Sequence, residues 1–196
     1  MSRMFRVALT TSLLLGCLYA PHSLAGWQLN NQLSQLSFVS VKAKDIAEAH
    51  TFKELRGGID ASGEVELVIE LASVDTLIPI RDERMQKLLF ETNLFPKARF
   101  KTRVDLEKLS ALPVGSADLH DVTGTLTLKE ATMDMSARLL VTRLSEGRVT
   151  VSTLKPILVN AGALGLADGI EALRQIAGLP SISLAVPVSF VLTFDG

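Results

Sequence analysis

Few side chains in this sequence have the type and spacing that catalysis or metal binding requires. His50 and His120 are the only histidines after the first 25 residues, and no metal-ligand pattern surrounds either one. The sequence contains no G-x-S-x-G elbow, P-loop, G-x-G-x-x-G turn or H-E-x-x-H helix. We therefore expect no catalytic residues, no metal and no cofactor, and the protein is not predicted to be an enzyme.

A cluster of acidic residues and a single cysteine could also take part in catalysis or metal binding, but each has a simpler explanation. Asp75, Asp82, Glu83 and Glu91 are close in sequence, but a water-exposed helix and the loop before it account for such a cluster. Cys17 is the only cysteine, so the chain forms no internal disulfide and has no thiolate-based metal site.

The N-terminus has the organisation of a secretory signal peptide. Arg3 and Arg6 precede an apolar run over residues 7–20, and small residues at Ser23 and Ala25 fit a cleavage site. The run is shorter than the roughly 20 residues that cross a bilayer. We expect residues 1–25 to be removed and the mature protein to be periplasmic. The alternative is a lipid anchor on Cys17, because residues 14–17 resemble a lipobox.

Charge and hydropathy narrow the class of partner. The formal net charge is −1, and no basic cluster is present to neutralise phosphates, so nucleic acid is not an expected partner. Mean hydropathy is +0.31, although no apolar stretch after the N-terminal one approaches membrane length. A chain of this hydropathy needs a large interior or an apolar binding site.

Alternation of apolar and polar residues at a period of two dominates the chain after residue 26, which predicts strands with one wet face. A short link at residues 129–132 predicts a hairpin. Pro187 cannot donate to a strand ladder and indicates a bulge or a seam of incomplete pairing. Clear runs cover residues 64–71, 98–106, 122–128, 133–141 and 184–194, and weaker runs cover residues 36–43, 50–59 and 149–158.

About eight antiparallel strands with one apolar face each can stack as two sheets or close as one, and periodicity alone leaves both open. Helical period appears at residues 81–91 and 164–177, where Gly178 and Pro180 end the second segment. No linker or repeat divides residues 26–196, which we interpret as one domain.

A series of short motifs in this order and spacing resembles the YceI-like family of exported lipid-binding proteins. The series is FVSVK at 38–42, EAHTF at 48–52, LRGGID at 55–60, SVDT at 73–76, IRDERM at 80–85, LFE at 89–91, FPKARF at 95–100 and VTGTLTL at 122–128. The resemblance implies an all-β fold, an antiparallel eight-stranded lipocalin-like barrel with one or two short helices at its ends. It also implies a cavity for a polyisoprenoid or similar amphiphile and no known catalytic residues.

The predicted ligand site combines the apolar faces of the alternating strands with large apolar residues that follow the first helix. Its members are Val65, Leu67, Ile69, Phe90, Leu94, Phe95, Phe100, Val104, Leu126, Met135, Leu139, Val188 and Phe190. The same strand residues could instead fill a solid core. The expected ligand is a long-chain isoprenoid, an isoprenoid quinone or another lipid, with transient contact to a membrane surface.

Two further questions stay open in the sequence. Residues 81–91 flank the expected portal for the ligand, and the segment 164–177 is the alternative portal. The alternative function is a non-catalytic interaction or assembly partner of an envelope protein.

Overall fold

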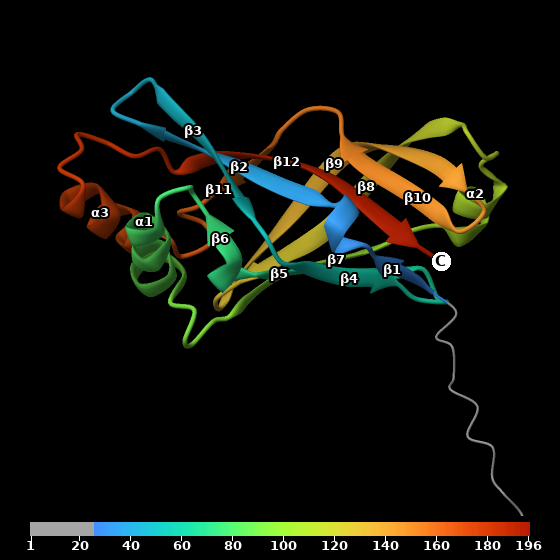
Figure 1. Cartoon of the computed structure of the whole chain (residues 1–196), viewed down its shortest axis with the longest axis horizontal. Coiled ribbons are helices and arrows are strands. Elements are labelled where there is room, and N and C mark those ends of the chain that lie inside the picture. The colour runs from blue at the N-terminus through green and yellow to red at the C-terminus, as the bar shows by residue number, and fades with distance from the viewer. Residues whose placement is uncertain (1–25) are drawn as a thin grey trace, which may run out of the picture.

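A computed structural model describes residues 26–196, so the expected signal peptide and Cys17 lie outside the described part. One antiparallel sheet curls through this part of the chain (Figure 1). Its strand segments are β1 (Trp27–Leu29), β2 (Gln35–Lys42), β3 (Ile46–Phe52), β4 (Leu55–Ile59), β5 (Glu64–Glu70), β6 (Val74–Asp75), β7 (Lys97–Arg103), β8 (Ala117–Leu128), β9 (Ala131–Ser145), β10 (Arg148–Thr153), β11 (Ile157–Asn160) and β12 (Ala185–Asp195).

The sheet closes into an eight-stranded barrel. Hydrogen-bonded neighbours follow the order β1-β4-β5-β7-β8-β9-β10-β12, and β12 pairs back onto β1 through Leu29 and Phe194. The remaining segments pair outside this ring: β2 with β12, β3 with β2, β6 with β3, and β11 with β12. Two stacked sheets would leave free edges, and closure of this ring removes them. Of the two arrangements that the periodicity allows, stacked sheets or one closed sheet, the protein therefore adopts the closed one.

Charge pairs cover the outer face of the barrel, as the alternation predicts. On β5 and β7, Glu66 lies opposite Lys101 and Glu70 lies opposite Lys97. The Glu66 carboxylate is 2.9 Å from the Arg99 guanidinium. Leu67, on the same strand as Glu66, points inward and is buried. Such cross-strand pairs fix which face of each strand is wet, and a slip of one residue would exchange the two faces.

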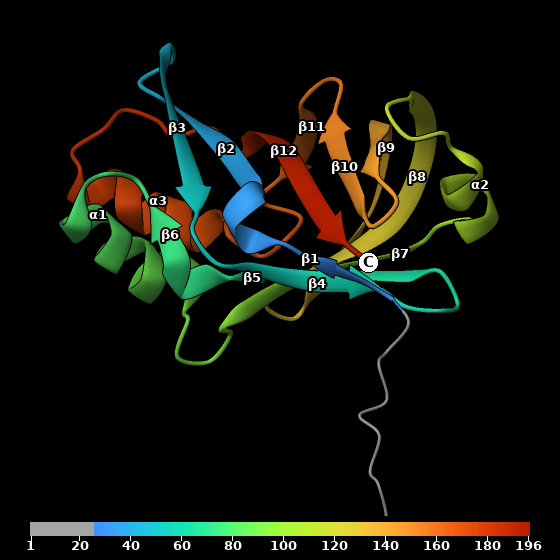
Figure 2. The ribbon, with the colours of Figure 1, turned by 45° about the vertical axis from the view of Figure 1, so that its right-hand side comes forward.

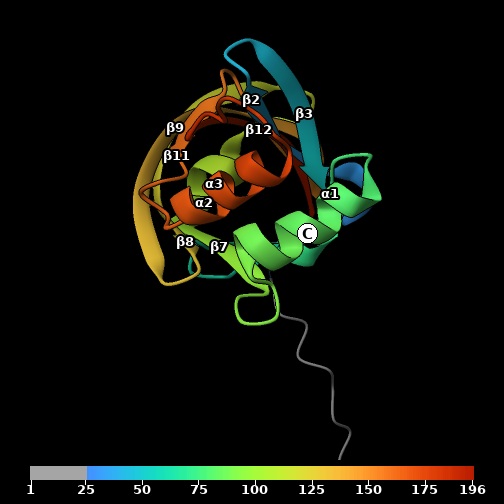
Figure 3. The ribbon, with the colours of Figure 1, turned by 90° about the vertical axis from the view of Figure 1, so that its left-hand side faces the viewer.

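Short helices lie at both ends of the barrel (Figure 2). At one end α1 (Pro79–Arg84) continues into a π-helical turn, η3 (Met85–Phe90), and α3 (Ala167–Ile176) packs against it. Figure 3 looks onto this end, which we call the lid end. Gly169 allows the close approach, because a Cβ there would lie 2.5 Å from the Leu88 carbonyl oxygen. None of the helices within residues 26–196 has the length and hydropathy to span a bilayer.

The opposite end of the barrel carries α2 (Leu106–Ala111), which the strand pattern does not predict. Alternation suggests a strand as far as Leu106, but β7 ends at Arg103. The Asp105 carboxylate accepts hydrogen bonds from the backbone N–H groups of Glu107 and Lys108 and so caps a helix at that point. This side-chain cap overrides the period-two pattern. The 3₁₀ turns η1 (Asn31–Leu33) and η2 (Leu71–Ser73) complete the helical segments.

Two local features follow the turn chemistry of the sequence. Lys129 and Glu130 join β8 to β9, and Lys129 adopts a positive φ of 54° at this tight turn. Pro187 lies opposite Leu158 of β11, and on its other side β12 pairs with β2 only from Val188 onward. The proline therefore sits where the ladder is incomplete on one side.

Candidate functional site

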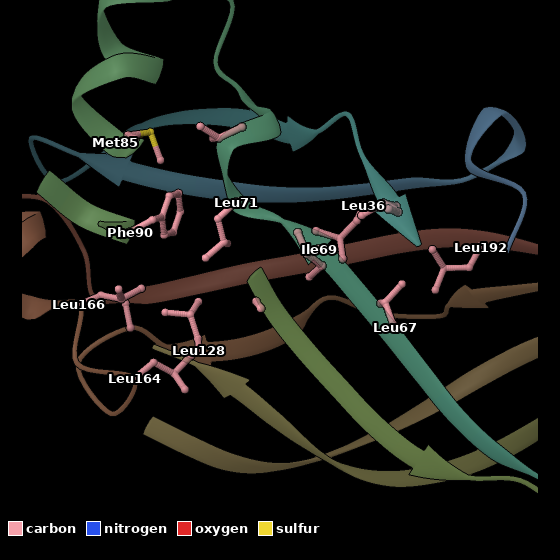
Figure 4. Close-up of a cluster of buried hydrophobic side chains, with 14 of the residues drawn as sticks. Leu36, Leu67, Ile69, Leu71, Met85, Phe90, Leu128, Leu164, Leu166 and Leu192 are labelled. Carbon is pink, nitrogen blue, oxygen red and sulfur yellow. The ribbon is translucent and has the colours of Figure 1, made fainter. Parts of the chain in front are cut away.

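The interior of the barrel is hollow and apolar. Its cavity has a volume of about 270 Å³, and a single buried water needs only about 10–15 Å³ on the same measure. Figure 4 shows side chains from opposite strands, such as Leu67, Leu128 and Leu192, directed into the space that the sheet encloses. Within residues 26–196, every lining residue is apolar except Thr102, Asp105, His120 and Ser136.

The predicted strand residues lie together around this cavity. Residues of the predicted site that line it are Val65, Leu67, Ile69, Phe90, Phe100, Val104, Leu126, Met135, Leu139, Val188 and Phe190. Several remain partly exposed although they point away from bulk solvent, as Val65, Phe100 and Leu126 do. Inward-facing side chains keep accessible surface when a barrel is hollow, whereas a close-packed core would cover it. As contacts to a ligand, these residues stay predictions.

Leu94 and Phe95 lie outside the cavity lining. The Leu94 side chain is 72% exposed. Phe95 lies beneath the ammonium group of Lys129, at 5.7 Å from the nitrogen to the ring centroid. The turn after η3 directs both side chains away from the barrel axis, whereas Phe90 points into it.

Sequence reasoning missed lining residues from the weaker strands and from the late helical segment. Phe38 and Phe52 line the cavity from β2 and β3. The weak run predicted over residues 50–59 belongs to two strands, because β3 ends at Phe52 and β4 begins at Leu55. Leu166 and Ile170 line it from the lid end, although their common helical face was visible in the sequence. Nothing in that face showed that it would turn inward rather than onto the outside of the sheet.

One aromatic ring of the cavity lining lies over a glycine of the neighbouring strand. Phe100 on β7 lies across the backbone of Gly124 on β8, and a Cβ at Gly124 would stand 2.4 Å from the Phe100 Cζ atom. Leu126, the partner of Phe100 across the strands, lines the same stretch. The absence of a side chain at Gly124 therefore sets the position of the ring and the width of the cavity.

A polar network holds α1 against β2 and β3 at the lid end. The Glu48 carboxylate lies 2.6 Å from the Lys42 ammonium and 2.5 Å from the Arg81 guanidinium. Its hydrogen bond with Lys42 and the nearby Arg81 hold the pKa of Glu48 below its usual value. Arg81 also donates hydrogen bonds to the hydroxyl and carbonyl oxygens of Thr76. These contacts attach the helix to two strands of the sheet.

His50 is buried beside this network, with 4% of its surface exposed. Its Nε2 atom is 2.9 Å from the Ser40 hydroxyl, and its Nδ1 atom is the one buried side-chain nitrogen or oxygen in residues 26–196 without a hydrogen-bond partner. Burial lowers the pKa of His50, and the Arg81 charge adds to that effect. The ring is therefore neutral at pH 7.

The two histidines do not form a joint site. His50 packs against Phe38 near the lid end, with ring centroids 5.3 Å apart. His120 lines the cavity toward the α2 end. Within the described part of the chain, His, Cys, Asp and Glu side chains form no group of three that could hold a metal ion.

Comparison with known proteins assigns the family. The model of the YceI-like domain matches residues 27–194, which is nearly all of the barrel. The chain belongs to the YceI-like family. No curated protein sequence matches this YceI-like chain.

Several solved structures resemble this YceI-like barrel. A polyisoprenoid binding domain from Saccharophagus degradans, implicated in plant cell wall breakdown, is 41% identical, with a TM-score of 0.85, and the match covers 87% of this chain and 98% of that one. BcnA from Burkholderia cenocepacia is 19% identical, with a TM-score of 0.64, and the match covers 84% of this chain and 98% of that one. The second likeness supports the fold alone.

Proposed function

We propose that this YceI-like protein binds a polyisoprenoid, an isoprenoid quinone or a similar long lipid inside its barrel and carries or stores it in the periplasm without catalysing a reaction. The observation that carries the proposal is the apolar cavity, which extends from the lid end to the α2 end. The relative from Saccharophagus degradans, described as a polyisoprenoid binding domain, supports the ligand class.

The size of the hydrophobic effect favours a long chain. Burial of one CH₂ group contributes about 0.8 kcal/mol, whereas association costs on the order of 4–15 kcal/mol. A chain of about 20 carbons can offset that cost and reach micromolar affinity, near −8 kcal/mol. No charged anchor within the cavity is needed, because the apolar tail supplies the affinity.

Exposed aliphatic side chains support transient contact with a membrane surface. Val114, Leu119 and Leu144 surround the α2 end and are each at least half exposed. Leu77, at a positive φ of 62°, and Ile80 protrude at the lid end. Apolar residues that rim a lipid cavity can enter the head-group region while the ligand transfers.

Export is part of the proposal and rests on the N-terminal sequence. Intact-mass measurement of protein from the envelope fraction should give a chain that begins at Gly26. A diacylglyceryl group on Cys17 as the first residue would show lipoprotein processing instead. Recovery of the unprocessed chain from the cytoplasm would overturn the periplasmic assignment.

A cavity-blocking variant tests ligand binding. Val188→Trp places a large ring inside the barrel, and Val191→Trp places the same ring on the outer face, where Val191 is 46% exposed. Purified envelope protein, extracted with organic solvent and analysed by mass spectrometry, should release an isoprenoid lipid from the wild type and from Val191→Trp. Val188→Trp should release little or none while staying folded. Equal lipid in both variants, or none in the wild type, would contradict the proposal.

A further inference from the structure

The polar groups of the cavity gather at its α2 end. Thr102 on β7 lies opposite Gly124, and His120 lies four residues further along β8 toward α2, opposite Leu139. Asp105 is the N-cap residue of α2. All three line the cavity, and we call them the polar end. The fourth polar lining residue, Ser136, has its hydroxyl 3.1 Å from that of Thr123 on the outer face.

Among residues 26–196, the lining of the lid end of the cavity has no comparable polar surface. Its lining side chains are buried and apolar, including Leu89, Phe90, Leu164 and Ile170. His50 lies nearby, but its Nδ1 atom is fully buried and His50 does not line the cavity. A polar head group placed among these residues would lose its water without gaining a partner, which is costly.

Water also reaches the polar end. The His120 side chain is 22% exposed, and Val104 and Val122 beside it are partly exposed. The Thr102 hydroxyl donates to the Thr123 carbonyl at 2.7 Å, so its lone pairs stay available as acceptors. A head group beside His120 can exchange a hydrogen bond with water for a hydrogen bond with the imidazole ring.

The charges around the polar end select against an anion. Asp105 lines the cavity, and the Asp118 carboxylate lies 3.7 Å from His120 Nε2. Among the described residues, no lysine or arginine lines the cavity. A phosphate at this end of the cavity would therefore meet two carboxylates and no lysine or arginine among the lining residues, so the nearest charges would repel it.

We propose that the polar end binds the head group of an uncharged amphiphile, an alcohol or a carbonyl compound, through the His120 imidazole. This inference rests on the proposed lipid binding and adds the orientation of the ligand and the selectivity of the site. The tail extends from the polar end toward α3, so the ligand enters tail first at the α2 end.

Three C20 isoprenoid probes test the selectivity: the alcohol, its monophosphate and the corresponding hydrocarbon. Wild-type protein should bind the alcohol more tightly than the phosphate. His120→Leu should weaken binding of the alcohol by about three- to tenfold, the effect of one lost hydrogen bond, and leave binding of the hydrocarbon unchanged. Thr125→Leu, on the outer face of the same strand, is the matched control and should alter neither.

A second variant removes the acidic groups without removing the helix cap. Asp105→Asn with Asp118→Asn should raise the affinity for the phosphate about threefold or more, because two negative charges are removed. The helix should persist, because asparagine also caps helices. Equal effects of His120→Leu on alcohol and hydrocarbon, or tighter binding of the phosphate by the wild type, would overturn the inference. Failure of the wild type to bind any probe would instead refute the proposed lipid binding.

Discussion

At the scale of single residues, His50 makes stability depend on pH. Burial lowers its pKa in the folded state below the ordinary value of 6.5, so the unfolded chain binds more protons as the pH falls below about 6.5. The stability that the neutral ring contributes is present above that pH and is lost as the pH falls through the folded-state pKa.

Urea unfolding of the mature protein should therefore show lower stability at pH 5.5 than at pH 7.5. His50→Gln keeps a partner for Ser40 but does not titrate, so its unfolding free energy should change less between the two pH values. Acidic groups whose pKa is lowered, such as Glu48 and Asp195, lose their contribution to stability only at pH values below this range. Equal pH dependence in the variant and the wild type would rule out His50 as the cause.

Gly124 illustrates how one missing side chain sets the width of the cavity. Gly124→Ala would place a Cβ 2.4 Å from both the Lys101 carbonyl oxygen and the Phe100 ring. We expect a loss of about 1–3 kcal/mol in the free energy of unfolding, the usual cost of overpacking, together with lower lipid capacity because the ring must move. Urea unfolding and lipid titration measure the two effects. Thr123→Ala, on the exposed outer face of the same strand, should change neither by a comparable amount.

At the scale of elements, the helices at the two barrel ends have different roles. The lid is attached by the Arg81–Glu48 pair at its start and by a Glu91–Lys129 pair at its end, and its inward side chains are buried. Helix α2 instead covers an end whose lining is partly exposed. We therefore expect the ligand to enter and leave at the α2 end. The sequence alone predicted a portal beside residues 81–91, which include most of α1 and lie at the lid end.

A pair of equal truncations separates the two portals. Leu109 of α2 and Leu166, next to α3, are both 7% exposed and both line the cavity. Each Leu→Ala change should cost about 2–5 kcal/mol in unfolding free energy. Leu109→Ala should speed transfer of a fluorescent isoprenoid to vesicles, and Leu166→Ala should not. The reverse result would place the portal at the lid end.

At the scale of the whole molecule, the short strand β1 closes the barrel. It pairs with β4 through Trp27 and with β12 through Leu29, so it joins the beginning of the sheet to its end. The Asn30 side chain adds a 2.7 Å hydrogen bond to the Asp195 carboxylate. Loss of β1 would leave β4 and β12 with free edges.

A chain that begins at Asn30 should therefore be less stable than one that begins at Gly26. Trp27 and Leu29 pack against the core, and burial of a large apolar side chain contributes about 1.5–3 kcal/mol. We expect a loss of about 3 kcal/mol or more in urea unfolding, together with a tendency to associate that gel filtration detects. Unchanged stability and a monomeric elution profile would show that closure by β1 is dispensable.

The sequence by itself determined the all-β class, the family and most of the inward-facing residues. Alternation at a period of two is a local property, because each side chain on a strand points opposite to its neighbour whatever the strand pairs with. It identified Val65, Leu126 and Val188 as members of one apolar face before any pairing was known. The two lid helices were visible for a similar reason, since a helical period is also local.

Only the tertiary structure decided whether that apolar face encloses space. Closure depends on the pairing of β1 with β12, whose residues Leu29 and Phe194 are far apart in sequence. The width of the cavity depends on how the Phe100 ring lies over Gly124, a contact between strands. The position of the polar end depends on the pairing of β7 with β8, which brings Thr102, Asp105 and His120 into the lining of one cavity. Each of these is a non-local contact, and local periodicity carries no information about which distant residues meet.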